Sequence, residues 1–308
     1  MRWTVALPTE NVGAGPDLIS AAAIGEMAAA LEAAGVDACH VTDHPYPPRA
    51  WVEAGGHHAL DPLIALSFAA AATRRIRLHT NIFVAAYRHP VLAAHSAATL
   101  DVLSGGRLIL GTGTGYLREE FEALGVDYLR RGAVLEEVIT TMQKVWSGEL
   151  GNEGNVLAPL PVSQPHPPIW FGGNSAVSMR RAVRLGQGWA PFPATRGLAK
   201  ATRTAALTDV DSLARAIGDM RSFATEIGRS EPIDICVTPF SHPHHRAALE
   251  PERLLDEAVQ LARLGVTWLS IRLPAPSRAG FLENVAGFAT EVVAQVDRRE
   301  SLADTDIR

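Results

Sequence analysis

The chain has 308 residues, of which 47% are hydrophobic and 20% charged, and its net charge is −5. This composition is typical of a globular protein that buries a core, and it excludes a disordered chain. With an acidic balance and no run of Lys or Arg, the sequence gives no sign of a nucleic-acid or membrane-surface partner.

The sequence predicts a cytoplasmic protein. Its longest apolar stretch, Leu63–Ala72, has about half the length of a membrane span. At the N-terminus, the short apolar run Trp3–Leu7 is not preceded by the features of a signal peptide. Cys39 and Cys236 fall in expected buried strands, so we predict free thiols in a reducing compartment rather than a disulfide.

Short apolar runs alternate with helical periodicity along the whole chain. The expected strands are Trp3–Leu7, Ala38–Val41, Ile76–Asn81, Arg107–Gly111, Ile169–Phe171, Gly188–Ala190, Ile233–Val237 and Trp268–Leu273. The expected helices are Ile24–Ala34, Pro62–Ala72, Pro90–Leu103, Leu129–Trp146, Ser175–Leu185, Leu207–Ile227, Pro251–Leu264 and Gly280–Val296. Because near-continuously apolar strands are buried on both faces, the pattern predicts a closed (β/α)8 TIM barrel. An open, doubly wound sheet is the alternative that a count of elements leaves open.

No change in composition divides the chain. We therefore predict a single barrel domain over residues 1–297, followed by a polar C-terminal tail at residues 298–308. The segment Ser147–Pro168 is rich in Pro, Gly and Asn and interrupts the alternation. It is predicted to be an insertion or a lid before the fifth strand.

In a barrel of this kind the loops after the strands build the site. The second expected strand is followed by Asp43 and His44, and the charge of a histidine changes near neutral pH. A lone loop histidine is often only structural, but the position of His44 at the mouth favours a catalytic role. Adjacent histidines such as His57 and His58 point apart, and no carboxylates accompany them, so a metal site is not expected.

Glycine-rich turns follow the fourth and fifth expected strands. In Gly111–Tyr116 the third glycine comes one residue too early for a dinucleotide fingerprint, and the acidic residue that should follow is missing. The turn is compatible both with a crowded rim and with backbone close to a planar or phosphorylated ligand. After the fifth strand, Gly172-Gly173-Asn174-Ser175 leads directly into a helix, which predicts a phosphate site at a helix N-terminus.

These motifs carry a family resemblance. The chain resembles the luciferase-like monooxygenase superfamily, and most closely its actinobacterial branch that depends on the deazaflavin coenzyme F420. The resemblance runs from Trp3 to about Val296 and is carried by Thr42–His44, Leu78–Ile82, Arg88–Pro90, Thr99–Leu108, Gly111–Gly115 and Pro168–Ser175. Within Thr99–Leu108, Asp101 and Arg107 are expected to form a supporting pair.

The resemblance implies roles for individual residues. His44 would contact the cofactor ring and take part in proton transfer, and Asn81–Ile82 would be a non-prolyl cis peptide pressed against that ring. The remaining cofactor residues implied are Asp43, Gly113, Thr114, Tyr116, Gly172, Gly173, Asn174 and Ser175. The loops after the strands, together with the expected lid, would form a substrate pocket that includes Tyr46, Trp51, Trp189 and Phe192. Any anionic cofactor tail would meet Arg196, Arg203 or Arg246, because the chain has only two lysines.

The resemblance thus implies an oxidoreductase that transfers a hydride between F420 and a small organic substrate, and a homodimer. Tyr116 stands where sugar-phosphate dehydrogenases of the superfamily carry an acidic residue, so that reaction is not expected. One alternative is an FMN-dependent two-component monooxygenase, which would need a separate flavin reductase. The other alternative is a catalytically silent barrel that binds a flavin.

Overall fold

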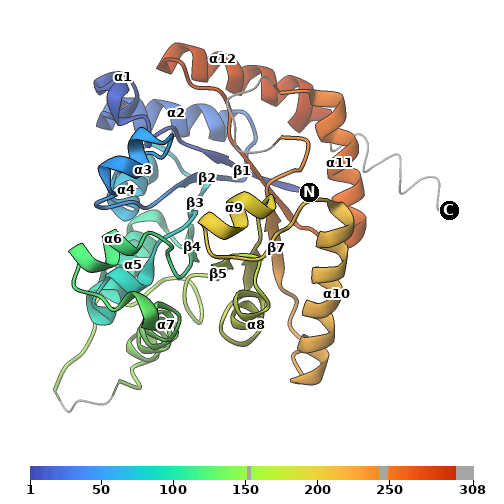
Figure 1. Cartoon of the computed structure of the whole chain (residues 1–308). Coiled ribbons are helices and arrows are strands. Elements are labelled where there is room, and N and C mark those ends of the chain that lie inside the picture. The colour runs from blue at the N-terminus through green and yellow to red at the C-terminus, as the bar shows by residue number, and fades with distance from the viewer. Residues whose placement is uncertain (151–153, 243–248, 296–308) are drawn as a thin grey trace.

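The structure is a computed structural model that describes residues 1–150, 154–242 and 249–295. The expected tail and Arg246 lie outside these described residues. Eight parallel strands are hydrogen-bonded in chain order from β1 to β8, and β8 pairs with β1 to close a barrel (Figure 1). This result confirms the predicted TIM barrel and excludes the open sheet.

The strands agree with the predicted ones to within two residues at each end. They are β1 (Arg2–Ala6), β2 (Ala38–Val41), β3 (Arg77–Thr80), β4 (Leu108–Thr112), β5 (Ile169–Gly172), β6 (Gly188–Ala190), β7 (Asp234–Val237) and β8 (Trp268–Ile271).

Helices surround the barrel (Figure 1). The α-helices are α1 (Pro16–Ile19), α2 (Ala21–Ala33), α3 (Arg49–Glu53), α4 (Pro62–Ala72), α5 (Pro90–Ser104), α6 (Arg118–Ala123), α7 (Arg131–Ser147), α8 (Ala176–Leu185), α9 (Arg196–Ala201), α10 (Val210–Glu226), α11 (Pro251–Leu264) and α12 (Arg278–Phe288). Shorter turns are η1 (Val12–Ala14), η2 (Ala85–Tyr87), η3 (Tyr128–Arg130) and the π-helical η4 (Ala289–Val293).

Local chemistry sets where several of these helices begin and end. The Asp61 side chain accepts hydrogen bonds from the N–H groups of Leu63 and Ile64 at the start of α4, where Pro62 occupies the first turn. The α5 helix ends at Gly105, which has a left-handed φ of 69° that favours glycine.

The strands bury two separate faces. Their outward side chains join the main core beneath the helices, while Ala38, Ile109, Trp170, Ala190, Cys236 and Trp268 form a second cluster inside the barrel. Also inside, Thr4 Oγ1 lies 3.0 Å from His40 Nδ1 and 3.3 Å from His79 Nδ1. Burial, together with the nearby His40 and Arg77, lowers the pKa of His79 well below its usual value.

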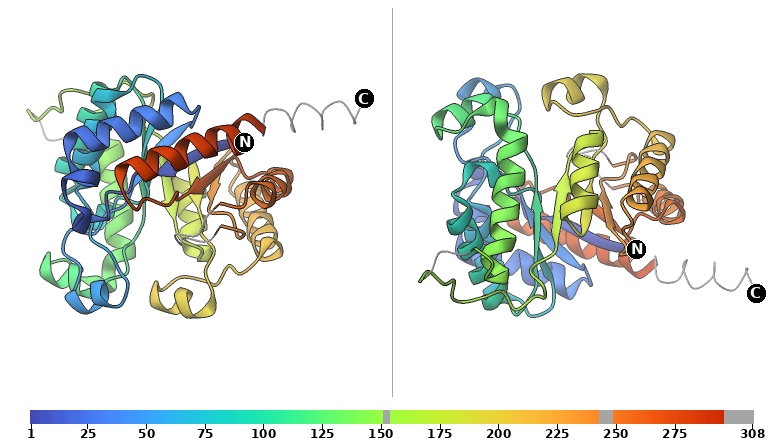
Figure 2. Two further views of the ribbon diagram at one scale, coloured as in Figure 1. Left: turned by 90° about the horizontal axis from the view of Figure 1, so that it is seen from above. Right: turned by 90° about the horizontal axis from the view of Figure 1, so that it is seen from below.

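The carboxyl ends of the strands meet at one rim, which we call the mouth. The short helices α3, α6 and α9 follow β2, β4 and β6, and they gather at this end (blue, green and yellow at the bottom of the left view in Figure 2). The loops that bring residues to the mouth are therefore those that follow the strands.

The described part of the segment Ser147–Pro168, residues 147–150 and 154–168, does not lie at the mouth. It connects the end of α7 to the beginning of β5, and the start of a strand lies at the opposite rim. There the buried Asp101 accepts hydrogen bonds from both the N–H and the Oγ of Ser163, each 2.8 Å long. The predicted lid is therefore wrong, because the connectivity puts this insertion at the far end of the barrel.

The expected pair between Asp101 and Arg107 is also wrong. Asp101 binds Ser163, and the Arg107 guanidinium instead donates to the backbone carbonyls of Ala70, Thr73, Ile76 and Ser104. Arg107 thus ties the loop before β3 to the loop before β4.

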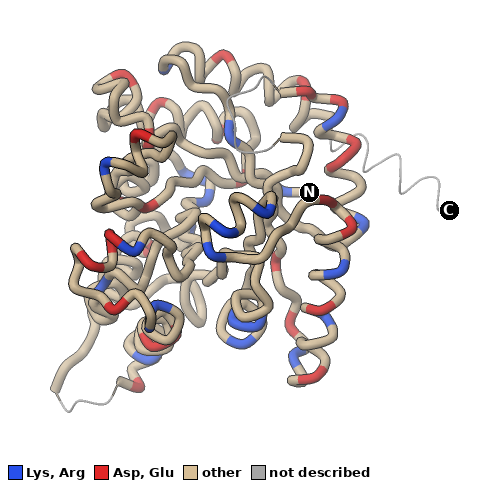
Figure 3. The backbone as a smooth tube through the Cα atoms, viewed as in Figure 1, with Lys and Arg blue, Asp and Glu red and all other residues tan. Residues whose placement is uncertain are grey.

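Acidic and basic residues are interspersed along the described backbone (Figure 3). In the described ranges, no helix is both long and apolar enough to cross a membrane. Cys39 and Cys236 are buried, free thiols, as predicted.

Candidate active site

His44 sits at the mouth, just after β2, and its side chain is 8% exposed. Both nitrogens of the imidazole have partners. Nδ1 lies 3.3 Å from Oε2 of Glu120, and Nε2 lies 3.3 Å from the hydroxyl of Tyr116. His44 is thus held between an acid and a phenol that come from the segment after β4.

Glu120 lies on the buried side of His44. It is fully buried in α6 and accepts hydrogen bonds from the Tyr87 hydroxyl at 2.9 Å and from the Tyr46 N–H at 3.2 Å. An ionised carboxylate can only accept, so it requires the proton of a neutral His44 to be on Nδ1. Nε2 is then the acceptor that faces Tyr116.

The two phenols flanking this pair remain protonated. Burial raises the pKa of Tyr116 to about 12, and the charge of Glu120 adds to the effect. Burial and the same carboxylate raise the pKa of Tyr87 further. Both hydroxyls are therefore neutral near pH 7 and can both give and accept a hydrogen bond.

An aromatic wall covers His44 on the side of the loop after β2. The ring of Trp51 lies 4.7 Å and that of His57 5.0 Å from the His44 ring, measured between centroids. Burial lowers the pKa of His57, which favours its neutral form. Tyr46 is 70% exposed, so it stands at the outer edge of the mouth.

Asp43 has a structural role rather than an open face toward a ligand. It is 3% exposed, and its carboxylate accepts from the Val84 N–H at 2.8 Å and from both terminal nitrogens of Arg88. These bonds fix the segment after β3 against the end of β2. The expected direct contact of Asp43 with a cofactor is not what this geometry supports.

The Asn81–Ile82 peptide is cis, as predicted. The Ile82 side chain lies over two glycines at the ends of β4 and β5. A Cβ built on Gly113 would be 2.3 Å from Ile82 Cδ1, and one on Gly172 would be 3.2 Å from Ile82 Cγ2. Asn81 reaches across the mouth, where its Nδ2 donates to Ser270 Oγ at 3.3 Å.

The turn after β5 leads directly into α8, as expected. However, the backbone N–H groups of Gly173 and Asn174 are already hydrogen-bonded within the protein. The φ of Gly173 is 109°, and its N–H donates to the Ala190 carbonyl at 3.2 Å. The N–H of Asn174 donates to Thr204 Oγ1, and its side chain bonds the backbone of Phe192 and Ala205.

The donors that remain for a phosphate lie one turn further on. Ser175 caps α8 by accepting from the Ser178 N–H at 3.1 Å, and the two hydroxyls lie 3.0 Å apart. In the described part of the chain, the N–H groups of Ala176 and Val177, in the first turn of α8, have no acceptor. Thr114 follows β4 and is half-buried.

Trp189 and Phe192, the two remaining residues expected in the substrate pocket, lie in different surroundings. Trp189 is 1% exposed in the main core, and its Nε1 donates to the Gly173 carbonyl at 2.9 Å. Trp189 therefore supports the turn at Gly173 from the core side. It does not form the open wall of the substrate pocket that had been expected. Phe192 is half-buried in the loop after β6, where Asn174 holds its backbone.

Three arginines gather around Tyr128 beside this turn. The guanidinium carbons of Arg118, Arg131 and Arg203 lie 4.5, 4.2 and 5.8 Å from the centre of the Tyr128 ring. Among the described residues neither Arg131 nor Arg203 forms an ion pair, and Arg118 has only a contact of 4.0 Å with Glu122. We call these three residues the arginine cluster. Of the three expected arginines, this cluster includes Arg203 but not Arg196, which lies at the start of α9.

Sequence reasoning missed Glu120, Tyr87, Arg118 and Arg131. The three glutamates of α6 look alike in sequence, and only packing shows that Glu120 is the buried one. In the ranges that the structure covers, no group of three or more His, Cys, Asp or Glu is arranged to hold a metal ion.

Comparisons with known proteins identify the family. Residues 1–250 match the family described as luciferase-like monooxygenase, and the chain belongs to it. The chain is 28% identical to an F420-dependent glucose-6-phosphate dehydrogenase of Beutenbergia cavernae, over 87% of this chain and 91% of that one.

Two other similarities point to flavin enzymes and to the fold. The oxygenase component of a flavin-dependent trigonelline monooxygenase of Acinetobacter baylyi is 31% identical over 49% of this chain, and the match spans 46% of that protein. The crystal structure of the monooxygenase RslO1 from Streptomyces bottropensis superposes with a TM-score of 0.75 at 19% identity, covering 96% of this chain and 99% of that one. This chain therefore belongs to a family of oxidoreductases whose members use either F420 or a flavin.

Proposed function

We propose that this protein is an oxidoreductase that transfers a hydride between coenzyme F420 and a small organic substrate at the mouth of the barrel. The observation that carries the proposal is His44, held at the mouth between Glu120 and Tyr116, at the same rim as the Ile82 side chain that packs on Gly113 and Gly172. A titratable group in such a place can exchange a proton with a bound molecule.

The residues present fit a tricyclic cofactor with a phosphate. Gly113 and Gly172 make room for the Ile82 side chain, which offers an apolar surface against which a flat ring would pack. Ser175, Ser178 and the free N–H groups in the first turn of α8 would hold the phosphate, favoured by the positive end of the helix. When bound, the deazaflavin supplies the hydride chemistry.

The chain itself would position the substrate, exclude water and move a proton. Glu120 fixes the orientation and tautomer of His44, so Nε2 is presented to the mouth through Tyr116. Trp51 and His57 cover the imidazole on the loop side. His44 would accept a proton at Nε2 when a substrate hydroxyl is oxidised, and would return it when a carbonyl is reduced.

Two observations favour F420 over FMN. The F420-dependent relative aligns over 87% of the chain, whereas the flavin-dependent one aligns over 49%. In addition, the arginine cluster is a cationic surface next to the proposed phosphate turn. It suits a ligand with negative charge beyond a single phosphate. The FMN-dependent monooxygenase, with a separate flavin reductase, is the second candidate.

An equilibrium titration tests this proposal. Purified protein is titrated with F420 and, separately, with FMN, and cofactor fluorescence is followed. We expect the dissociation constant to be lower for F420 than for FMN. Binding of FMN alone would favour the monooxygenase, and binding of neither would favour a silent barrel.

We also propose a homodimer built on outer helices. The neighbouring helices α4 and α5 expose large apolar side chains: Ile64, Phe68, Leu92 and Leu103 are 63, 45, 65 and 71% exposed. Burying such a patch against a second copy would stabilise the pair. Light scattering tests this, and a monodisperse monomer would refute the dimer without affecting the site.

A further inference from the structure

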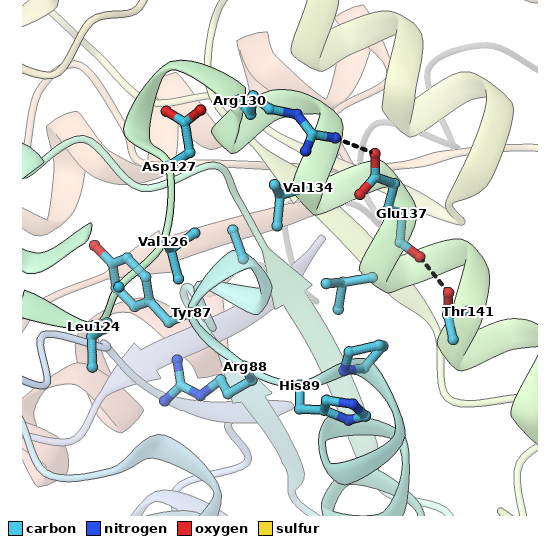
Figure 4. Close-up of a pocket in the computed structure, with 14 residues that line it drawn as sticks. Tyr87, Arg88, His89, Leu124, Val126, Asp127, Arg130, Val134, Glu137 and Thr141 are labelled. Atoms are coloured by element: carbon cyan, nitrogen blue, oxygen red, sulfur yellow. Dashed lines mark hydrogen bonds and ion pairs between the residues drawn. The ribbon is translucent and has the colours of Figure 1, made fainter. Parts of the chain in front are cut away.

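A second opening lies on the flank of the barrel rather than at the mouth. It is a groove of about 590 Å³ between the segment Ala86–Pro90 and the segment that runs from Leu124 into α7. Figure 4 shows Tyr87, Val126 and Val134 along this groove, with Asp127, Arg130 and Glu137 at its polar edge. Nothing in the proposed hydride transfer uses this groove.

Tyr87 connects the groove to the active site. Its side chain lines the groove, while its hydroxyl donates to Glu120 Oε2 at 2.9 Å. The same oxygen lies 3.3 Å from Nδ1 of His44, whose Nε2 is 3.3 Å from the hydroxyl of Tyr116. We call Tyr116, His44, Glu120 and Tyr87 the proton chain. Of these four residues only Tyr87 lines the groove, and Glu120 itself is fully buried.

We propose that the proton chain exchanges the proton of the reaction with water in the flank groove, with Tyr87 as the outlet. This inference rests on the proposed role of His44 in hydride transfer. It assigns a relay function to Glu120, which is fully buried behind His44, and to Tyr87, which lines the groove. A site closed by substrate and cofactor would then still have a path to solvent.

The transfer conserves protons and moves no electrons. When Nε2 of His44 accepts a proton from the substrate side, its Nδ1 proton passes to Oε2 of Glu120. The protonated Glu120 then donates to the oxygen of Tyr87, whose hydroxyl turns and gives its own proton to groove water. One proton enters at the mouth and one leaves at the groove, and His44 is left with its proton on Nε2, which is the form from which the reverse transfer starts. Reduction of a carbonyl runs the sequence in reverse.

The raised pKa of Tyr87 fits this role. A phenol that burial and a carboxylate keep protonated can hand a proton on without a long-lived phenolate. A purely structural Tyr87 would hold Glu120 in place and would have no effect on how fast protons reach solvent.

The test uses Tyr87→Phe, which keeps the ring contact with Phe121 at 4.7 Å and removes only the hydroxyl. The matched control is Thr141→Val, because Thr141 lines the same groove outside the proton chain. The cofactor-free, full-length protein is labelled with 15N-histidine, and NMR reports the tautomer of His44 and the solvent exchange of its Nδ1 proton.

We expect Tyr87→Phe to slow this exchange by at least about tenfold with the tautomer unchanged, and Thr141→Val to leave it as in the wild type. Glu120→Gln, which keeps the shape but cannot relay a proton, should slow it as well. Wild-type exchange in a folded Tyr87→Phe or Glu120→Gln protein would overturn the relay. Because no cofactor is present, this outcome is separate from a failure of F420 to bind.

Discussion

The buried carboxylate of Glu120 lies 3.3 Å from Nδ1 of His44, although 76 residues separate the two in the chain. The pair joins the loop after β2 to the helix after β4, so it exists only because the barrel places these strand ends at the same rim. The orientation of the mouth histidine thus depends on a fully buried residue from a distant part of the chain.

Replacing Glu120 should therefore disable His44 without removing it. We expect Glu120→Gln to lower kcat by about 10- to 100-fold at unchanged cofactor affinity, because one charge-assisted hydrogen bond is worth about 1.5–3 kcal/mol. The control is Glu119→Gln, an exposed neighbour in the same helix. Equal kcat values for the two variants would show that Glu120 is only a packing residue.

His44→Phe should separate binding from turnover. We expect F420 affinity to stay within roughly tenfold of wild type, since about one hydrogen bond of 1 kcal/mol is lost. Turnover should fall by about 10²–10⁴, the range for a positioned acid or base. Steady-state kinetics with a titration of the variant checks both numbers, and an unchanged turnover would remove His44 from the mechanism.

A further prediction concerns Gly173, in the turn after β5, and its role in cofactor binding. Gly173 has a φ of 109°, and a Cβ there would be 2.9 Å from Ser178 Oγ. Gly173→Val should weaken F420 binding and cost about 1–3 kcal/mol of unfolding free energy, which leaves the barrel folded. Gly218→Ala, in open space on α10, is the control. Wild-type affinity in Gly173→Val would mean that the turn has no role in binding.

A substitution in the arginine cluster should affect the binding of F420 more than the binding of FMN. Arg203→Gln is expected to weaken F420 binding by about 10- to 100-fold, since hydrogen bonds to charged groups contribute about 1.5–3 kcal/mol. FMN binding should change by less, because FMN carries only its single phosphate. Arg215→Gln, exposed on α10, provides the comparison. A similar loss for both cofactors would place Arg203 at the phosphate instead.

From His79, buried inside the barrel, we predict how the free energy of unfolding depends on pH. The pKa of His79 is lowered from an ordinary 6.5, so below pH 6.5 the unfolded chain binds a proton that the folded chain refuses. The free energy of unfolding should therefore fall as pH drops below this value, by at most about 1.4 kcal/mol per pH unit from this group. His79→Gln should flatten the slope in urea titrations. Parallel slopes for the two proteins would contradict a neutral His79.

The fold could be predicted from the sequence, whereas much of the site could not. Strands buried on both faces are continuous apolar runs, so β2 and β6 were expected at the residues where they occur. The side of the barrel on which Ser147–Pro168 lies follows from connectivity, yet its composition suggested a lid. The partners of Asp43 and Glu120 come from segments far away in the chain, and no local pattern separates Glu120 from the exposed Glu119.

The most direct test of the central claim is the fate of the reduced cofactor in air. A deazaflavin has a carbon where a flavin has a nitrogen that reacts with oxygen, so it acts as a hydride carrier. Reduced F420 and reduced FMN are each mixed with the protein in air-saturated buffer, and absorbance and oxygen consumption are followed before and after adding an organic acceptor. We predict that reduced F420 binds, persists in air and is oxidised only when the acceptor is added. Tight binding of reduced FMN with rapid oxygen consumption, and no binding of F420, would contradict the account.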